Sequence, residues 1–172
     1  SAIPEYESGD LKVVTGDNGQ VRFGEAALEL DYDYASYDGS SNANYYIRYC
    51  GEDIDIEGYP SEVGVWVYAP EATPSAYTLY IQVEYWTGSD YAAKYIPLKA
   101  EGSEATGFTW SGWAYCSADI TSLWPNISEE HPLKIQPGQG ILWLSYQPKT
   151  GGGRYNGSLY FDNFRVVYGT DM

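Results

Sequence analysis

The chain has 172 residues and a formal net charge of −15, because 24 acidic residues outnumber nine Lys and Arg. This charge repels phosphate backbones and argues against nucleic-acid binding. The six Trp, 19 Tyr and four Phe argue against a disordered acidic chain, and the length suits one folded domain with a full hydrophobic core.

The hydrophobic pattern alternates with a period of two in short runs separated by Gly, Pro, Asn and Asp, which is typical of β-strands. The run 62–69 is apolar on both faces, which predicts a central strand. A turn at Thr87 to Asp90 joins the runs 77–86 and 91–98. The other predicted segments, in chain order, are 27–34, 44–50, 110–118, a short turn at 120–124, 133–135, 141–147 and 158–168.

These nine or ten runs predict an all-β fold, namely a two-sheet antiparallel β-sandwich of the jelly-roll type. Alternation assigns several aromatic residues to the core: Tyr32, Tyr34, Tyr45, Tyr49, Phe161, Phe164 and Trp113. The remaining Trp66, Trp110 and Trp124 are expected in core or loop packing. Cys50 and Cys116 allow a single pairing, and a disulfide and two buried thiols both stay open.

No run of about 18 apolar residues is present, so we predict no membrane insertion. The sequence shows no charged segment followed by an apolar segment, the pattern of a signal peptide. Ser1 to Pro4 resembles the start of a domain that has been excised from a longer chain. We therefore expect residues 1–172 to be one domain excised from a larger secreted protein, and we expect it to be a monomer.

The candidate binding face starts from the run 77–86. Its Leu79, Ile81 and Val83 point to the core, so the residues between them must point away. Aromatic rings stack on the C–H faces of sugars, and amides and carboxylates bond their hydroxyls. If the runs 44–50 and 141–147 share a sheet with it, they build a glycan-binding face with a rim from the loop 151–158. The predicted ligand-binding residues are Tyr46, Arg48, Tyr80, Gln82, Glu84, Trp86, Trp143, Gln147, Arg154 and Tyr155. The alternative is that these aromatics only reflect β-propensity.

Four segments, in order, resemble those of jelly-roll carbohydrate-binding modules, which are galactose-binding-like β-sandwiches appended to bacterial carbohydrate-active enzymes. The resemblance implies this fold, sugar binding in many members, and a structural calcium. The four segments are Glu5-Tyr-Glu-Ser-Gly9, Ala26 to Tyr34, Trp110-Ser-Gly-Trp113 and Tyr160 to Gly169. The low content of Lys and Arg beside many acidic residues also fits a secreted or cell-surface, extracellular bacterial protein.

By this resemblance, Glu7 and Asp162 would bind the calcium, with Glu5 and Glu25 as weaker candidates. Asp162 also interrupts an apolar strand, where a bare carboxylate is costly. The alternative is an Asp162 that pairs with Arg165 or lies at a bulge. The acidic cluster from Glu52 to Glu57, which includes Asp53 and Asp55, is interpreted as a solvated loop.

A catalytic role lacks the residues it needs. A jelly-roll glycosidase based on Glu84 requires a second carboxylate across the scissile bond, and the only acids after Glu130 are Asp162 and Asp171. One histidine, His131, and no G-x-S-x-G motif argue against a nucleophilic triad or a zinc site. We predict no catalytic residues.

We therefore predict a non-catalytic module that binds a neutral polysaccharide, either plant β-glucan or hemicellulose, or starch-type α-glucan. Neutral ligands are favoured because the net charge repels acidic glycans. The module would tether covalently linked catalytic or scaffold domains to the glycan. The alternatives are a structural or interaction β-sandwich without glycan binding and, third, a glycosidase that uses Glu84.

Overall fold

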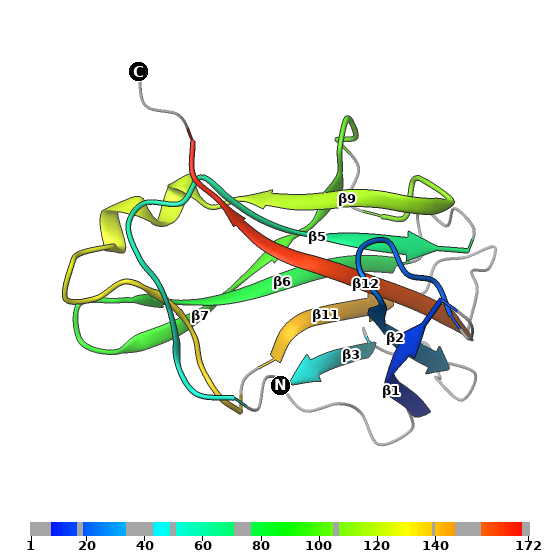
Figure 1. Ribbon diagram of the computed structural model, residues 1–172. Coiled ribbons are helices and arrows are strands. Elements are labelled where there is room, and N and C mark those ends of the chain that lie inside the picture. Colours follow the sequence, from blue (N-terminus) through cyan, green and yellow to red (C-terminus); the bar gives the residue numbers. More distant parts are fainter. Residues whose placement is uncertain are drawn as a thin grey trace.

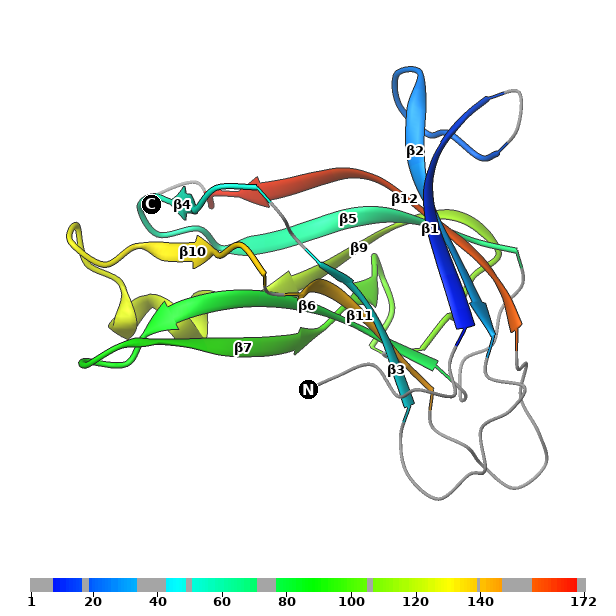
Figure 2. The same ribbon diagram turned by 90° about the horizontal axis from the view of Figure 1, so that it is seen from below.

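The computed structural model describes residues 8–16, 19–33, 43–48, 51–70, 77–104, 107–138, 140–146 and 156–169. These residues form twelve strands and one short 3-10 helix, and the strands make two antiparallel sheets packed face to face (Figure 1, Figure 2). The predicted two-sheet jelly-roll sandwich is confirmed. The model contains no helix, within the described ranges, that is long and apolar enough to cross a membrane.

Sheet A has six strands, and the chain's last strand lies in its middle beside β5. The position of β5 between β12 and β9 confirms that the run 62–69 is central. In spatial order the strands are β1 (Ser8–Thr15), β2 (Ala26–Asp33), β12 (Asn156–Val167), β5 (Glu62–Ala69), β9 (Gly112–Asp119) and β8 (Lys99–Ala100).

Sheet B is built around β6, which pairs with β7 along one edge and with β11 and then β10 along the other. β3 pairs with β11 and β4 pairs with β10, so both form the outer edge. The strands are β3 (Ala43–Arg48), β4 (Ile54–Ile56), β6 (Tyr77–Trp86), β7 (Tyr91–Pro97), β10 (Leu133–Ile135) and β11 (Gly140–Tyr146), and the helix η1 is Thr121–Asn126.

Every second side chain along the strands points into the space between the two sheets and fills it. Leu79, Ile81 and Val83 of β6 are buried, together with alternate residues of the neighbouring strand β11 and of β5 in the other sheet. Each such side chain contributes about 1.5–3 kcal/mol by leaving water. Strands β1, β4 and β8 were missed, since β1 lacks a clean alternation and the other two have only three and two residues.

The core assignment is confirmed for Tyr32 and Phe161, which are buried, and it is wrong for Phe164, which is 37% exposed. Phe164 lies within a β-bulge between Asp162 and Arg165, where β12 loses its regular pairing with β5 and alternation no longer assigns a side. Asn163, within the bulge, has a φ of 56°. Tyr34, Tyr49 and the side chain of Tyr45 lie outside the described part of the chain.

Cys116 is a free, buried thiol rather than half of a disulfide, and burial raises its pKa to about 12. Cys50 lies outside the described residues.

Candidate functional site

The candidate site is the outer face of sheet B, the face that points away from sheet A. Strands β3, β11 and β6 are neighbours in this sheet, as the predicted face required. Trp143 of β11 lies directly opposite Tyr46 of β3 on one side and Tyr80 of β6 on the other. Since the residues flanking these positions are buried in the core, the three aromatic positions form one row across the outer face; the buried flanking residues are Ile47, Leu79, Ile81, Leu142 and Leu144.

Gln82 and Glu84 follow Tyr80 on the same face of β6, yet they are only 1% and 3% exposed. The Gln82 amide Nε2 donates to Glu84 Oε1 over 2.8 Å, and the backbone N–H of Gln136 also bonds to the Glu84 carboxyl. Gln82 and Glu84 were predicted to contact ligand from an open face. Here both side chains are buried and are hydrogen-bonded to each other.

Burial raises the pKa of the Glu84 carboxyl above its ordinary value of 4.5, and the charge of Asp53 acts in the same direction. The hydrogen bonds from Gln82 and Gln136 oppose this rise without cancelling it. The folded protein therefore holds the Glu84 proton more tightly than the unfolded chain does.

The stability that this proton contributes is fully present below the ordinary pKa of 4.5 and is lost as the pH rises through the raised pKa of the folded state. We expect the free energy of unfolding of the wild type to fall with rising pH relative to that of Glu84→Gln, which does not titrate. Urea unfolding of both proteins between about pH 4 and 7 measures this difference. A difference that stays constant over that range would contradict the raised pKa.

Trp86, at the end of β6, is packed rather than bare. The His131 imidazole stacks on its ring at a centroid distance of 3.9 Å and an angle of 8°. Tyr91 contacts the Trp86 ring edge-on at 5.4 Å and donates its hydroxyl to the Pro132 carbonyl over 2.8 Å. One face of the Trp86 ring is therefore covered by imidazole.

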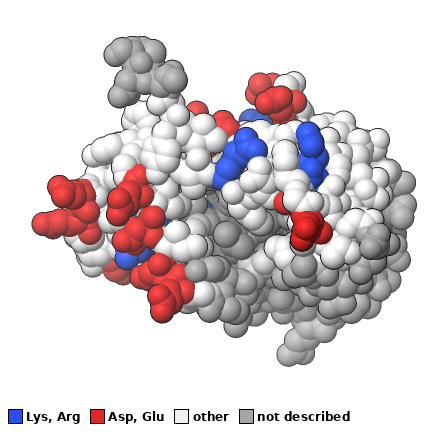
Figure 3. Space-filling model, viewed as in Figure 1, with Lys and Arg blue, Asp and Glu red and all other residues white. Residues whose placement is uncertain are grey.

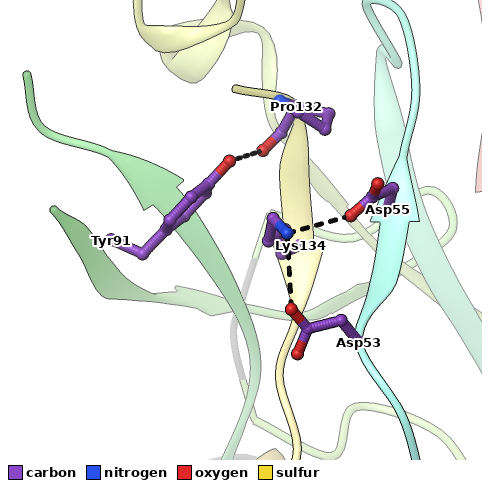
Figure 4. A network of polar contacts seen from close by, with 5 residues as sticks. All are labelled: Asp53, Asp55, Tyr91, Pro132 and Lys134. Atoms are coloured by element: carbon purple, nitrogen blue, oxygen red, sulfur yellow. Dashed lines mark hydrogen bonds and ion pairs between the residues drawn. The ribbon is translucent and has the colours of Figure 1, made fainter. Parts of the chain in front are cut away.

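Lys134 continues the outer face beyond Glu84, its partner in the β10–β6 pairing. Its Nζ lies 3.2 Å from Asp55 Oδ1 and 3.3 Å from Asp53 Oδ2 (Figure 4), and 5.3 Å from the centre of the Tyr91 ring. The hydrogen bond to Asp55 is the largest of the effects that raise the pKa of Lys134. Asp53 and Asp55 are exposed, in agreement with the interpretation as solvated residues, and both also pair with this cation.

Lys134 and its partners were not predicted as part of the site, although the sequence contains a signal for their pairing. β4 reads Ile-Asp-Ile and β10 reads Leu-Lys-Ile, so two short strands carry opposite charges at their centres. Opposite charges at paired positions favour this pairing. Asp55 and Lys134 are indeed directly opposite each other.

The remaining predicted ligand residues are only partly located. For Tyr46, Arg48 and Trp143 the structure describes the strand backbone alone. Gln147, Arg154 and Tyr155, and the predicted metal ligand Glu7, lie outside the described residues.

Asp162 binds the connection between β1 and β2. Its Oδ2 accepts the backbone N–H groups of Arg22 over 2.9 Å and of Phe23 over 2.8 Å. Asp162 lies at the start of the β12 bulge, and Arg165 lies over the Tyr115 ring at 5.0 Å. The bulge is thus the reason for an acid within this strand.

The surroundings of Asp162 do not fit a calcium ion at Oδ2. Calcium needs six to eight oxygen ligands, whereas the contacts recorded for this oxygen are N–H donors. Within the described ranges, no three His, Cys, Asp or Glu residues are grouped to hold a metal. Because Glu7 is not among these residues, the calcium site stays a prediction.

Asp162→Ala is expected to lower the free energy of unfolding by about 1–2 kcal/mol, the usual contribution of hydrogen bonds to a charged acceptor at a partly exposed site. Because the partners are N–H groups, the loss should be equal in calcium and in EDTA. Thermal unfolding of both proteins in each buffer measures it. A calcium-dependent rise in the wild-type Tm that Asp162→Ala lacks would instead place a metal at this carboxylate.

Comparison with known proteins supports the fold. No protein-family model and no curated protein matches the chain. A solved carbohydrate-binding module of the β-sandwich superfamily superposes with a TM-score of 0.54 at 13% identity, over 94% of this chain and 54% of its own length. The chain therefore spans about half of that structure.

Two further solved structures superpose less well. The xylan-binding CBM22-1 domain from Paenibacillus barcinonensis gives a TM-score of 0.40 at 13% identity, covering 99% of this chain and 91% of its own. CBM27-1 from Caldicellulosiruptor saccharolyticus, in complex with mannohexaose, gives 0.46 at 16% identity, covering 92% and 82%. At these identities the similarity concerns the fold alone.

Proposed function

We propose that this chain is a non-catalytic module that binds a neutral polysaccharide on the outer face of sheet B. The observation that carries the proposal is the row of Tyr46, Trp143 and Tyr80, which three strands from distant parts of the sequence bring into direct cross-strand register. The fold, shared with a carbohydrate-binding module, supports the same function.

The chemistry of the face suits a sugar chain. Rings stack on the apolar faces of pyranoses, and the polar groups beyond them, Lys134 with Asp53 and Asp55, offer both donors and acceptors for hydroxyls. The buried pair of Gln82 and Glu84 stiffens the strand between the two parts of the face. A rigid platform loses less conformational entropy when the ligand binds.

The net charge of −15 selects against acidic glycans by long-range repulsion. We therefore propose plant β-glucan or hemicellulose, or starch-type α-glucan, as the ligand. The module would act outside the cell, as a monomer that tethers linked catalytic or scaffold domains to that polysaccharide.

Affinity electrophoresis of the 172-residue chain in gels that contain xylan, glucomannan, mixed-linkage β-glucan or soluble starch tests the proposal. We expect at least one of these neutral polymers to retard the protein, and polygalacturonate not to. Absence of retardation in all four gels would contradict glycan binding and favour a structural or interaction domain. Release of reducing sugar that Glu84→Gln abolishes would indicate a glycosidase.

A further inference from the structure

The outer face of sheet A also carries aromatic residues, on the opposite side of the sandwich from the proposed site. In β5 and β9 the core side holds small and branched residues, with Val63, Val65, Val67, Cys116 and Ala118 buried. The residues between them point outward and are partly exposed: Trp66, Tyr68, Trp113 and Tyr115. The prediction that Trp113 belongs to the core is therefore wrong, whereas Trp66 packs against Arg22 and Phe23 of the β1–β2 connection, in agreement with the expected core or loop packing.

Three of the outward rings form a second cross-strand row. Tyr68 of β5 lies directly opposite Tyr160 of β12 and Trp113 of β9. The ring centroids are 5.7 Å apart for Tyr68 and Tyr160, and 5.5 Å for Tyr68 and Trp113, with edge-on angles of 83° and 69°. The row crosses three strands, as the row on sheet B does.

A second pair of aromatic rings lies beside this row, and an arginine side chain packs over each of them. Trp66 and Tyr115 are 5.8 Å apart. The Arg22 guanidinium lies 4.6 Å from the Trp66 ring, on the connection that Asp162 anchors, and Arg165 lies 5.0 Å from the Tyr115 ring. Because the arginines pack over Trp66 and Tyr115, these two rings lie beside the row with part of their surface covered.

A hollow of about 630 Å³ adjoins Tyr115 along the β8–β9 edge. Hydrogen-bonding groups line it, among them Lys99, Glu101, Ser103 and Ser117. Tyr115 lies flat over Gly64, where any side chain would collide with its ring, and donates its hydroxyl to Glu62 Oε2 over 2.8 Å. The rings thus continue into a recess with both apolar surface and hydrogen-bonding groups, a combination that suits the C–H faces and the hydroxyls of a sugar.

The charge on this side of the molecule also suits a neutral chain. Figure 3 views the side on which β12 overlies β6, and most of the acidic groups there lie towards the end that holds β4 and β10, with others at the top of the view and right of its centre. Asp55, Glu57, Glu129 and Glu130 line a hollow at that end. The middle of the view is mostly uncharged, with basic groups on it.

We propose that the outer face of sheet A is a second glycan-binding surface, which takes a neutral polysaccharide chain across Tyr160, Tyr68 and Trp113. The surface combines separate, partly exposed rings with a recess that also carries hydrogen-bonding groups, whereas a protein-docking face is expected to be a continuous apolar patch. With a surface on each side, one module holds two chains or two parts of one chain, and avidity exceeds either single affinity.

Four variants test the second surface: Tyr68→Ala with Trp113→Ala for sheet A, Tyr80→Ala with Trp143→Ala for sheet B, these four changes together, and Tyr168→Ala as a control. Tyr168 is 51% exposed and lies outside both rows. Retardation is measured in the four neutral-polysaccharide gels, and cross-linking by the turbidity of soluble glucomannan and xylan. We expect each double variant to keep weakened retardation and to lose cross-linking, and the four-residue variant to lose both.

The outcomes separate this surface from the proposed function. Retardation that disappears with the sheet B variant alone, and is unchanged in the sheet A variant, overturns the second surface and leaves the first. Loss with the sheet A variant alone supports the second surface and overturns the first. No retardation of the wild type overturns both. Sedimentation velocity tests a further outcome. If the wild type is a dimer and Tyr68→Ala with Trp113→Ala is a monomer, a second copy of the chain and not a glycan occupies the face.

A folding control keeps the result interpretable. Tyr68→Phe and Trp113→Phe retain an aromatic ring at each position, and we expect both to keep at least half of the wild-type retardation. Near-UV circular dichroism and Tm report whether the alanine variants are folded. Equal loss of binding in the phenylalanine variants, with an unchanged Tm, would contradict ring stacking.

Discussion

Replacing Tyr80 and Trp143 together by alanine is expected to weaken polysaccharide binding at the outer face of sheet B by about 100-fold, or about 2.7 kcal/mol. The two residues are direct neighbours in the row across β11 and β6. Truncation of a ring that stacks on a flat ligand typically costs about 1–3 kcal/mol, so loss of both removes most of the stacking energy.

The measurement is made in a chain that already carries Tyr68→Ala and Trp113→Ala, so that only the sheet B face contributes. Dissociation constants from affinity electrophoresis then compare that background with and without the additional changes. Tyr168→Ala in the same background should change binding less than twofold. If Tyr80→Ala with Trp143→Ala weakens polysaccharide binding by less than about threefold, the row is not part of the binding site.

Glu84→Ala is expected to lower the free energy of unfolding by about 3 kcal/mol or more. The Glu84 carboxyl accepts hydrogen bonds from the Gln82 amide and the Gln136 backbone N–H, and Gln82 and Glu84 are both buried. Removal of the acceptor leaves these donors without their partner, and each such group typically costs about 1–3 kcal/mol. The cavity left behind adds to the loss.

Glu84→Gln is the matched variant, because its amide oxygen still accepts from Gln82, and it should lose about 1 kcal/mol. Urea unfolding at neutral pH compares the two variants with wild type. The exposed Glu129→Ala should stay within about 0.5 kcal/mol. Equal small effects for both changes at Glu84 would mean that the carboxyl is open to solvent and free for a ligand.

The alternation of the sequence was enough to predict the inward and outward sides of several strands. Leu79, Ile81 and Val83 are buried as expected, and Tyr80 and Trp86 are outward and half-buried. A period of two follows from strand geometry, in which successive side chains point to opposite faces. It therefore holds wherever the strand is regular.

Alternation failed where the strand is irregular. Phe164 lies within the bulge after Asp162 and is exposed, because the pairing with β5 is interrupted there and a period of two no longer assigns each side chain to a face. Trp113 was assigned to the wrong side for a different reason, since a strand with apolar residues on both faces offers no contrast from which to choose the inner one.

The sequence by itself determined the all-β class, the central position of the run 62–69 and the aromatic content of three outward strand faces. Only the tertiary structure decided that β3, β11 and β6 are neighbours, that the side chains of Gln82 and Glu84 are buried, and that the His131 ring stacks on Trp86. A strand's periodicity records which way each side chain points. It does not record which strand lies beside it or what covers its outer face, because those contacts join residues far apart in the chain.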